Sequence, residues 1–412
     1  MLSFLTALLG SPANADPLPS IKDLPVIEGL PDPLVLLNGE KVTSKEIWNT
    51  KRKPELMELF QDYMYGYLPP KPEKVEWKII HEDREAFNGK AILQEVAITV
   101  GPPEAPKIHV LLVVPKKRTG PAPVFVGINF SGNHSLVNDP KIKIPTAWMY
   151  PNRIGVKDNL ATEEGRGKEI EVWNIEQIID RGYAVATFYG GDVDPDRADK
   201  REGIRPFLPK PKGANIGTGT IAVWTWGIHR VVDYLVTDKD LDKSRIICVG
   251  HSRLGKTALL AAAFDDRIAM TIPHQAGCGG TAPSRGKVGE SVKQINDRFP
   301  HWFCDNFKLF NDNTAKLPFD QHCLVALCAP RPVLFTNAQE DQWANPNGQF
   351  EMLKAADPVY RLLNAGGFDG KEPELNKLVD SKLGFHLRAG KHSMNKDDWK
   401  VFLDFADKWL KK

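Results

Sequence analysis

The sequence predicts an α/β fold with a mostly parallel central sheet and an antiparallel N-terminal edge. Two observations support this prediction. From residue 183 onward, apolar runs of strand length alternate with segments whose apolar residues recur every three or four positions, a pattern typical of alternating strands and helices. Before that point, residues 91–132 contain three apolar runs in succession, which indicates neighbouring strands without helices between them.

The first 15 residues have the pattern of a secretory signal peptide. An apolar run over residues 2–9 is followed by Ala-Asn-Ala at 13–15, a small-residue pattern that precedes signal cleavage. The usual basic residues are missing, because the first Lys or Arg is Lys22. Two interpretations therefore stay open, a chain that starts inside its signal and an apolar tail. Cleavage would give a secreted or periplasmic protein.

Residues 16–412 are predicted to form a single domain. Its first part, about residues 16–70, is rich in proline and is expected to wrap around the rest. Helical patterns occur in it over 45–53 and 54–65, and Pro54 suits the first turn of the second helix.

Each later element is predicted from its own pattern. The strands are short apolar runs rich in β-branched and aromatic residues, and the helices have apolar residues three or four positions apart. We expect strands over 91–100, 107–115, 122–132, 183–191, 245–250, 268–277, 331–339 and 384–392, and helices over 219–238, 252–266 and 396–412. An antiparallel edge before a doubly wound part is typical of a three-layer α/β-hydrolase sandwich.

Composition argues against two classes of partner. The formal net charge is only +2 and no long run of Lys or Arg occurs, so nucleic-acid binding is not expected. No later stretch reaches the roughly 18 apolar residues of a membrane helix, so no membrane partner is expected. We expect a monomer.

No metal or cofactor is predicted. The five cysteines form no CxxC pair and no cluster with zinc-ligand spacing, so most are expected to be small buried apolar residues. Asp192, Asp194 and Asp196 have the spacing of a calcium loop, but the glycine and the bidentate glutamate of such a loop are absent. We interpret this stretch as a polar loop.

The strongest candidate site is Ser252, in the sequence VGHSRLGK at residues 249–256. A serine between a buried strand and a helix has its hydroxyl above the sheet edge, and the next backbone N–H points at a developing oxyanion. Gly250 precedes the serine by two positions, and Gly255 could relieve crowding in the first helical turn. The alternative is a serine that only caps the helix.

A nucleophilic serine needs a histidine base and an acid, which follow it in this order in the fold: serine, acid, histidine. Four of the ten histidines follow Ser252 at a plausible distance: His301, His322, His386 and His392. His386 lies inside a predicted strand and is expected to be buried. His392 follows that strand directly before the last helix, so it is the candidate base. Asp341 and Glu340 follow an earlier strand and are the candidate acids.

The residues around Ser252 show a specific resemblance to a known family. Residues 250–256 match G-x-S-R-x-G-K, the signature of the glucuronoyl esterases, family 15 of the carbohydrate esterases, so the late glycine has the family's own spacing. Other blocks resemble the bacterial branch of the family: NFSGNH (129–134), AGCGG (276–280), FPHWFCDNF (299–307), FDQHCLVALCAPRPVL (319–334) and EDQWANP (340–346). The resemblance extends from about residue 45 to the C-terminus.

The resemblance implies an α/β-hydrolase without a cofactor that cleaves the ester between 4-O-methyl-glucuronic acid of xylan and a lignin alcohol. Ser252 would be the nucleophile and His392 the base. Arg253 would help to stabilise the oxyanion through its backbone N–H, with its guanidinium as a second route. Three further residues resemble sugar-binding positions of the family: Lys256, Glu290 and Trp343.

One position departs from the family pattern. Many members carry a glutamate acid after the strand that follows the elbow helix, and here Gln275 occupies that place. A neutral amide cannot stabilise an imidazolium as a carboxylate does. The acid is therefore expected to be Asp341, with Glu340 as the fallback.

The sequence thus predicts a serine esterase acting on a uronate ester of the plant cell wall. An acetyl xylan esterase with the same three residues is the main alternative. A carbohydrate-binding relative without activity is a second alternative, which an intact Ser252, His392 and Asp341 disfavours.

Overall fold

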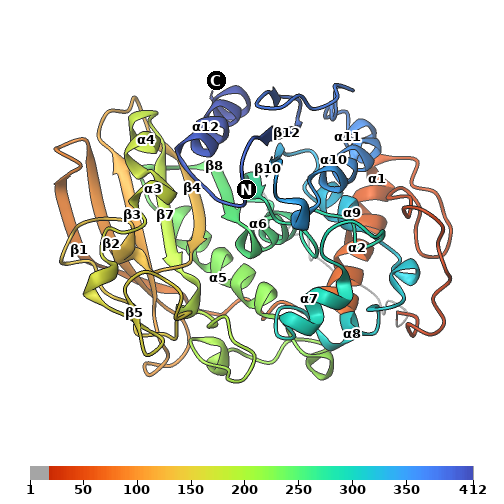
Figure 1. Cartoon of the computed structure of the whole chain (residues 1–412), viewed down its shortest axis with the longest axis horizontal. Helices are drawn as coiled ribbons and strands as arrows, with labels where there is room; N and C mark the ends of the chain where they lie inside the picture. The colour runs from red at the N-terminus through yellow and green to blue at the C-terminus, as the bar shows by residue number, and fades with distance from the viewer. Residues whose placement is uncertain (1–17, 412) are drawn as a thin grey trace, which may run out of the picture.

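The computed structural model describes residues 18–411, in which a ten-stranded sheet crosses the molecule (Figure 1). The predicted signal peptide at residues 1–15 lies outside the described residues. The strand order is β1-β2-β3-β7-β4-β8-β9-β10-β12-β11. The sheet strands are β1 (Glu76–Ala86), β2 (Ala91–Thr99), β3 (Ile108–Pro115), β4 (Ala122–Asn129), β7 (Ala184–Tyr189), β8 (Leu241–His251), β9 (Ile268–His274), β10 (Val333–Ala338), β11 (Leu378–Val379) and β12 (Leu383–Arg388).

The pairing of the strands confirms the predicted sheet. β1, β2, β3 and β7 pair antiparallel in succession and form the N-terminal edge. From β7 through β4, β8, β9 and β10 to β12, every neighbouring pair is parallel. The carboxyl ends of these parallel strands therefore meet at one edge of the sheet, which is where open α/β sheets bind their ligands.

Helices cover both faces of the sheet, which gives the three predicted layers (Figure 1). The packed residues of α5 and α6 belong to one apolar core, and those of α3, α4 and α12 belong to a second core on the other face. The helices are α1 (Lys45–Ile47), α2 (Lys53–Phe60), α3 (Ile170–Trp173), α4 (Ile175–Asp180), α5 (Thr220–Leu235), α6 (Arg253–Phe264), α7 (Val292–Arg298), α8 (Asp305–Lys308), α9 (Gln321–Leu327), α10 (Pro346–Ala355), α11 (Asp357–Leu362) and α12 (Lys396–Leu410). A separate two-stranded hairpin consists of β5 (Val156–Lys157) and β6 (Leu160–Ala161).

The N-terminal segment packs on the side of the molecule opposite β1 (Figure 1). Helical structure is continuous from Lys45 to Tyr65, with wider turns on either side of α2, so the two predicted helices are one. Pro54 lies in the first turn of α2, directly after the wider turns of residues 48–52, where a nitrogen without N–H interrupts the ladder at the change from wide to α-helical turns. α2 packs against α9, which ties the segment to the later half of the chain.

The sequence pattern missed β1, the helices α3 and α4, and all the helices between β9 and β12. β1 is an edge strand whose first five residues are exposed, so it lacks the alternation of apolar and polar residues that identifies a half-buried strand. All five cysteines are buried and none forms a disulfide bond, as expected if they serve as small apolar residues. Within residues 18–411, no helix is long and apolar enough to cross a membrane.

Candidate active site

Ser252 lies between β8 and α6, at the carboxyl edge of the parallel strands. Its backbone has φ 59° and ψ −125°, a conformation that a residue other than glycine adopts only when the surrounding structure enforces it. α6 begins at the next residue, Arg253, and the Ser252 side chain makes no capping hydrogen bond to the helix. The geometry is therefore that of a nucleophile elbow rather than of a helix cap.

Two glycines make this turn possible. A Cβ on Gly250 would lie 2.1 Å from the carbonyl oxygen of Leu254, because strand and helix cross there at very short range. A Cβ on Gly255 would lie 2.9 Å from Gly250 O and 3.0 Å from His274 O. The late glycine thus serves the same close approach of strand and helix as the early one.

Asp341 and His392 meet beyond the ends of β10 and β12. The two strands are parallel neighbours, and their backbone hydrogen bonds continue past the strand ends, from Glu340 N to Gly390 O at 3.0 Å. His392 Nδ1 lies 2.6 Å from Asp341 Oδ2, and the Asp341 side chain is only 8% exposed. Glu340 is exposed, so of the two candidate acids it is Asp341 that pairs with His392.

His251 precedes Ser252 in the chain and contacts His392. Its ring packs against that of His392 with centroids 4.5 Å apart and planes tilted by 39°, and it also lies 5.1 Å from the ring of His274. Burial and the neighbouring histidines hold the pKa of His251 well below its usual range, so this ring is neutral. In the described residues, no hydrogen bond joins the Ser252 hydroxyl to His392; such contacts often close only when substrate binds.

The guanidinium of Arg253 is surrounded by a carboxylate and by aromatic side chains. It forms an ion pair with Asp196 through Nη1. Four aromatic rings have centroids 4.6–6.0 Å from its central carbon, namely Phe130, Tyr150, Phe299 and Trp302. The guanidinium is thus engaged by Asp196, whereas the Arg253 backbone N–H lies in the first turn of α6, where it has no intrahelical acceptor.

Asp196, which pairs with Arg253, could not be recognised as part of this site from the sequence. Its Oδ1 accepts hydrogen bonds from His301 Nε2 at 2.8 Å and from Trp302 Nε1 at 2.7 Å. Burial alone would raise the pKa of Asp196, but the hydrogen bond from His301 and the charge of Arg253 outweigh it and lower this pKa. The spacing that suggested a calcium loop serves other purposes: Asp194 pairs with Arg205, and Asp192 accepts a backbone N–H.

Of the three candidate sugar-binding residues, Lys256 lies on α6, Glu290 on a loop before α7 and Trp343 in a short turn after β10. Lys256 is buried on α6, and its Nζ donates to Ala276 O and Cys278 O, each at 2.5 Å. Burial lowers the pKa of Lys256, and the negative charge of Glu290 opposes that shift. The backbone N–H of Glu290 donates to Trp343 O at 3.0 Å, and the Trp343 ring is 49% exposed. An exposed ring beside polar groups is suited to contact a sugar.

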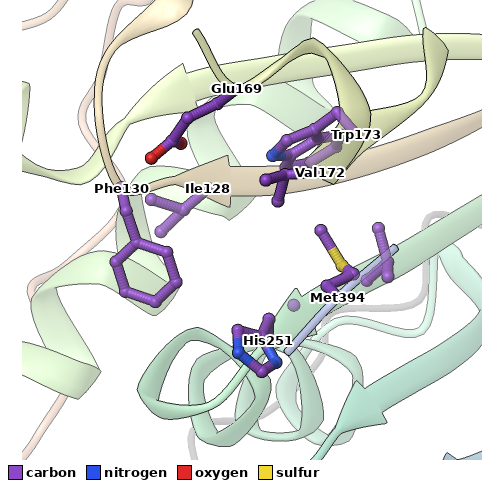
Figure 2. Close-up of a pocket in the computed structure, with 9 residues that line it drawn as sticks. Ile128, Phe130, Glu169, Val172, Trp173, His251 and Met394 are labelled. Carbon is purple, nitrogen blue, oxygen red and sulfur yellow. The ribbon is translucent and has the colours of Figure 1, made fainter. Parts of the chain in front are cut away.

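A narrow cleft of about 20 Å³ is lined in part by His251 (Figure 2). Its lining is mostly apolar, with Glu169 and His251 as the titratable members: Ile128, Phe130, Glu169, Val172, Trp173, Val249, Gly250, His251 and Met394. This volume holds about one water molecule and no sugar ring. The cleft is therefore part of the packing behind His251.

The side chains that surround the Arg253 guanidinium were not predicted from the sequence. The only signals were the blocks at 129–134 and 299–307, which carry Phe130, Phe299, His301 and Trp302. Across residues 18–411, no three His, Cys, Asp or Glu side chains are grouped so that they could hold a metal ion.

Comparisons with known proteins agree on one family. A family model described as "Glucuronyl esterase, fungi" matches residues 162–364. The solved structure of a promiscuous CE15 esterase from a marine bacterial metagenome is 45% identical, covers 95% of this chain and 99% of its own, and has a TM-score of 0.87. The glucuronoyl esterase of Solibacter usitatus is 37% identical, with coverage of 94% and 100% and a TM-score of 0.86. The 4-O-methyl-glucuronoyl methylesterase of Phanerochaete carnosa is 28% identical over 81% of this chain and 72% of the relative.

Proposed function

This chain belongs to the glucuronoyl esterases, family 15 of the carbohydrate esterases, and we propose that Ser252, His392 and Asp341 are its catalytic triad. It is a carboxylic ester hydrolase with the α/β-hydrolase fold. The proposed substrate is the ester between (4-O-methyl-)glucuronic acid of glucuronoxylan and a lignin alcohol.

One observation carries the assignment of the triad. The 2.6 Å contact between His392 Nδ1 and Asp341 Oδ2 lies at the same sheet edge as Ser252 in its elbow conformation. With Nδ1–H donated to the carboxylate, Nε2 of His392 is left to accept a proton. A histidine in this tautomer beside an elbow serine is the arrangement that acyl transfer requires.

In the first step, Ser252 Oγ attacks the ester carbonyl and its proton moves to His392 Nε2. The imidazolium that forms is stabilised by the adjacent carboxylate of Asp341. The carbonyl oxygen becomes an oxyanion, which accepts a hydrogen bond from the backbone N–H of Arg253. That N–H is in the first turn of α6, where it has no intrahelical acceptor and where the helix dipole favours negative charge.

Collapse of this intermediate breaks the bond to the alcohol, which leaves with the proton from His392. Ser252 then carries the uronoyl group as an ester. A water molecule gives its proton to His392 and attacks the acyl carbon, and the free uronic acid departs as Ser252 regains its proton. Apart from this water molecule, neither half of the reaction requires a group outside the chain and the substrate.

The substrate proposal rests on the family together with three side chains. Lys256 and Glu290 would hydrogen bond to the sugar hydroxyls, and the exposed ring of Trp343 would contact the apolar face of the sugar. Because the uronate carboxyl is esterified, recognition depends on these neutral hydroxyl contacts rather than on a substrate charge.

The experiment that tests the substrate compares benzyl glucuronate with p-nitrophenyl acetate under identical conditions. We expect the higher kcat/KM with the uronate ester. Rapid cleavage of the acetate without cleavage of the uronate would instead establish the acetyl esterase alternative. The Ser252→Ala variant should lose turnover of both esters, with the exposed Ser244→Ala as a matched control that retains it. Uronate binding without turnover in the unaltered protein would identify a binding relative.

We also propose export to the periplasm or the medium, which rests on the N-terminal pattern alone. The mature exported chain should begin at Asp16. An exported protein that retains residues 1–15 would contradict cleavage at this position.

A further inference from the structure

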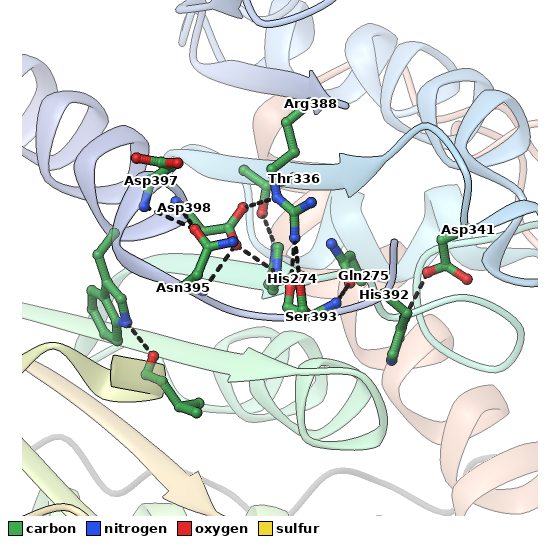
Figure 3. A network of polar contacts seen from close by, with 12 residues as sticks. His274, Gln275, Thr336, Asp341, Arg388, His392, Ser393, Asn395, Asp397 and Asp398 are labelled. Atoms are coloured by element: carbon green, nitrogen blue, oxygen red, sulfur yellow. Dashed lines mark hydrogen bonds and ion pairs between the residues drawn. The ribbon is translucent and has the colours of Figure 1, made fainter. Parts of the chain in front are cut away.

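The residue next to the proposed base is held more firmly than the base itself. His392 is 40% exposed, and its side chain has one polar partner, Asp341. Ser393 has partners for its backbone N–H, its carbonyl oxygen and its hydroxyl (Figure 3). The place of the His392 ring therefore depends on how Ser393 is anchored.

Gln275 anchors the backbone N–H of Ser393. Its Oε1 accepts that N–H at 3.0 Å, and its side chain is almost fully buried. Its own backbone has φ 49°, in the left-handed region, and is held by a hydrogen bond from Gln275 N to Thr336 O at 2.9 Å. The amide Nε2 is buried and has no hydrogen-bond partner. A buried donor without a partner lowers stability, so stability does not explain why an amide occupies this position.

His274 anchors the other side of Ser393 and also reaches the nucleophile. Its Nε2 donates to Ser393 O at 2.8 Å, while its Nδ1 accepts from Thr336 Oγ1 at 2.7 Å. Its backbone oxygen accepts the N–H of Ser252 at 2.9 Å. One residue at the end of β9 thus touches both the elbow and the loop that carries the base.

Arg388 completes the anchor from β12. Its Nη2 donates to Ser393 O at 2.9 Å and to Ser393 Oγ at 2.8 Å. Its Nε donates to Asp398 Oδ1 at 2.7 Å, and Asp398 is buried in the first turn of α12. The anchor is therefore continuous with the helix that follows the loop.

We propose that His274 and Gln275 are positioning residues that hold the His392 loop at the distance from Ser252 that proton transfer requires. This inference rests on the proposed function, because it takes His392 as the base. Neither residue touches the reacting atoms: Gln275 acts through Ser393, and His274 acts through Ser393 and through the backbone N–H of Ser252. The catalytic cost of losing such an anchor should be large, since a small displacement of a base slows proton transfer far more than it weakens substrate binding.

The test uses Gln275→Met, which keeps the length of the side chain but removes the acceptor for Ser393 N–H. We expect kcat on benzyl glucuronate to fall about 10- to 100-fold with KM unchanged within about twofold. Tm should change little, because the variant leaves Ser393 N–H without its acceptor but also removes the unpartnered Nε2 donor, and these two effects oppose each other. Gln275→Glu keeps an acceptor oxygen and should retain kcat within about fivefold.

Gln321→Met is the matched control, since Gln321 is equally buried and also uses one amide group, donating from Nε2 to Gly280 O at 2.7 Å. We expect this variant to retain kcat. A Gln275→Met enzyme with unchanged kcat would overturn the inference, as would parallel losses of kcat and Tm in both methionine variants. His392→Ala, assayed alongside, separates the two proposals. If His392→Ala remains active, the proposed triad fails; if it is inactive while Gln275→Met is normal, only the positioning role fails.

Discussion

Replacement of Asp341 by asparagine is the most informative change in the proposed triad. Asparagine has nearly the shape of aspartate, so the loop that continues from β10 should keep its path. The variant removes the negative charge next to His392 Nδ1 and replaces part of the acceptor with an amide donor. We expect slower acylation and unchanged folding.

The size of the effect can be worked out from the contact. Two unit charges about 4 Å apart interact by about 4 kcal/mol at an effective dielectric constant of about 20. The carboxylate is 8% exposed but the imidazole is 40% exposed, so water screens part of this interaction. About 3 kcal/mol remains, which is about 10²-fold in rate. Loss of the fixed tautomer adds to the charge effect, so we expect kcat to fall about 10²- to 10³-fold.

The assay measures kcat and KM on benzyl glucuronate for Asp341→Asn and Glu340→Gln. Glu340→Gln is the matched control, because it removes a carboxylate one residue away that does not contact His392. Its kcat should stay within about twofold of the unaltered enzyme. If Asp341→Asn keeps nearly full activity while Glu340→Gln loses it, the acid is Glu340 and the reasoning above is wrong.

Three further outcomes are expected. Gly255→Ala should lower the free energy of unfolding by about 1–3 kcal/mol, since its Cβ would lie 2.9 Å from a backbone oxygen. Gly120→Ala, with no atom within 4 Å of its new Cβ, should show no such loss in thermal denaturation. Burial raises the pKa of Asp192 from 3.8 to about 6, so the folded protein binds this proton more tightly and loses stability as pH rises through that range. Asp192→Asn should therefore raise Tm near pH 8, by a margin that shrinks toward pH 4; an equal margin at both would contradict this origin. Trp343→Ala should raise KM for benzyl glucuronate about 5- to 10-fold without changing Tm, because the ring is half exposed; an unchanged KM would remove Trp343 from the sugar site.

The parts of the fold that sequence predicted are those with strong local signals. Residues 246–250 of β8 and all of β10 are buried apolar runs, and the glycines at 250 and 255 mark a close approach of strand and helix. Because Asp341 and His392 each follow the end of a parallel strand, their meeting at one sheet edge could be anticipated. The contact is present, and the catalytic roles stay predictions.

The parts that sequence could not predict depend on distant or weakly patterned segments. β1 is an exposed edge strand with charged residues on both faces. It therefore lacks the alternation of apolar and polar residues by which a half-buried strand is recognised. Asp196 and His301 hydrogen bond across 105 residues of sequence, and no local spacing links them. The amide at Gln275 looked only like a missing acid, and its contact with Ser393 N–H became visible only in three dimensions.

The most direct test of the central claim is to trap the covalent intermediate. Turnover of benzyl glucuronate is stopped with acid within the first catalytic cycle, and the peptides are then mapped by mass spectrometry. We expect a glucuronoyl ester on the peptide containing Ser252, absent from the Ser252→Ala protein. An adduct on another residue, or undiminished hydrolysis by Ser252→Ala, would contradict it.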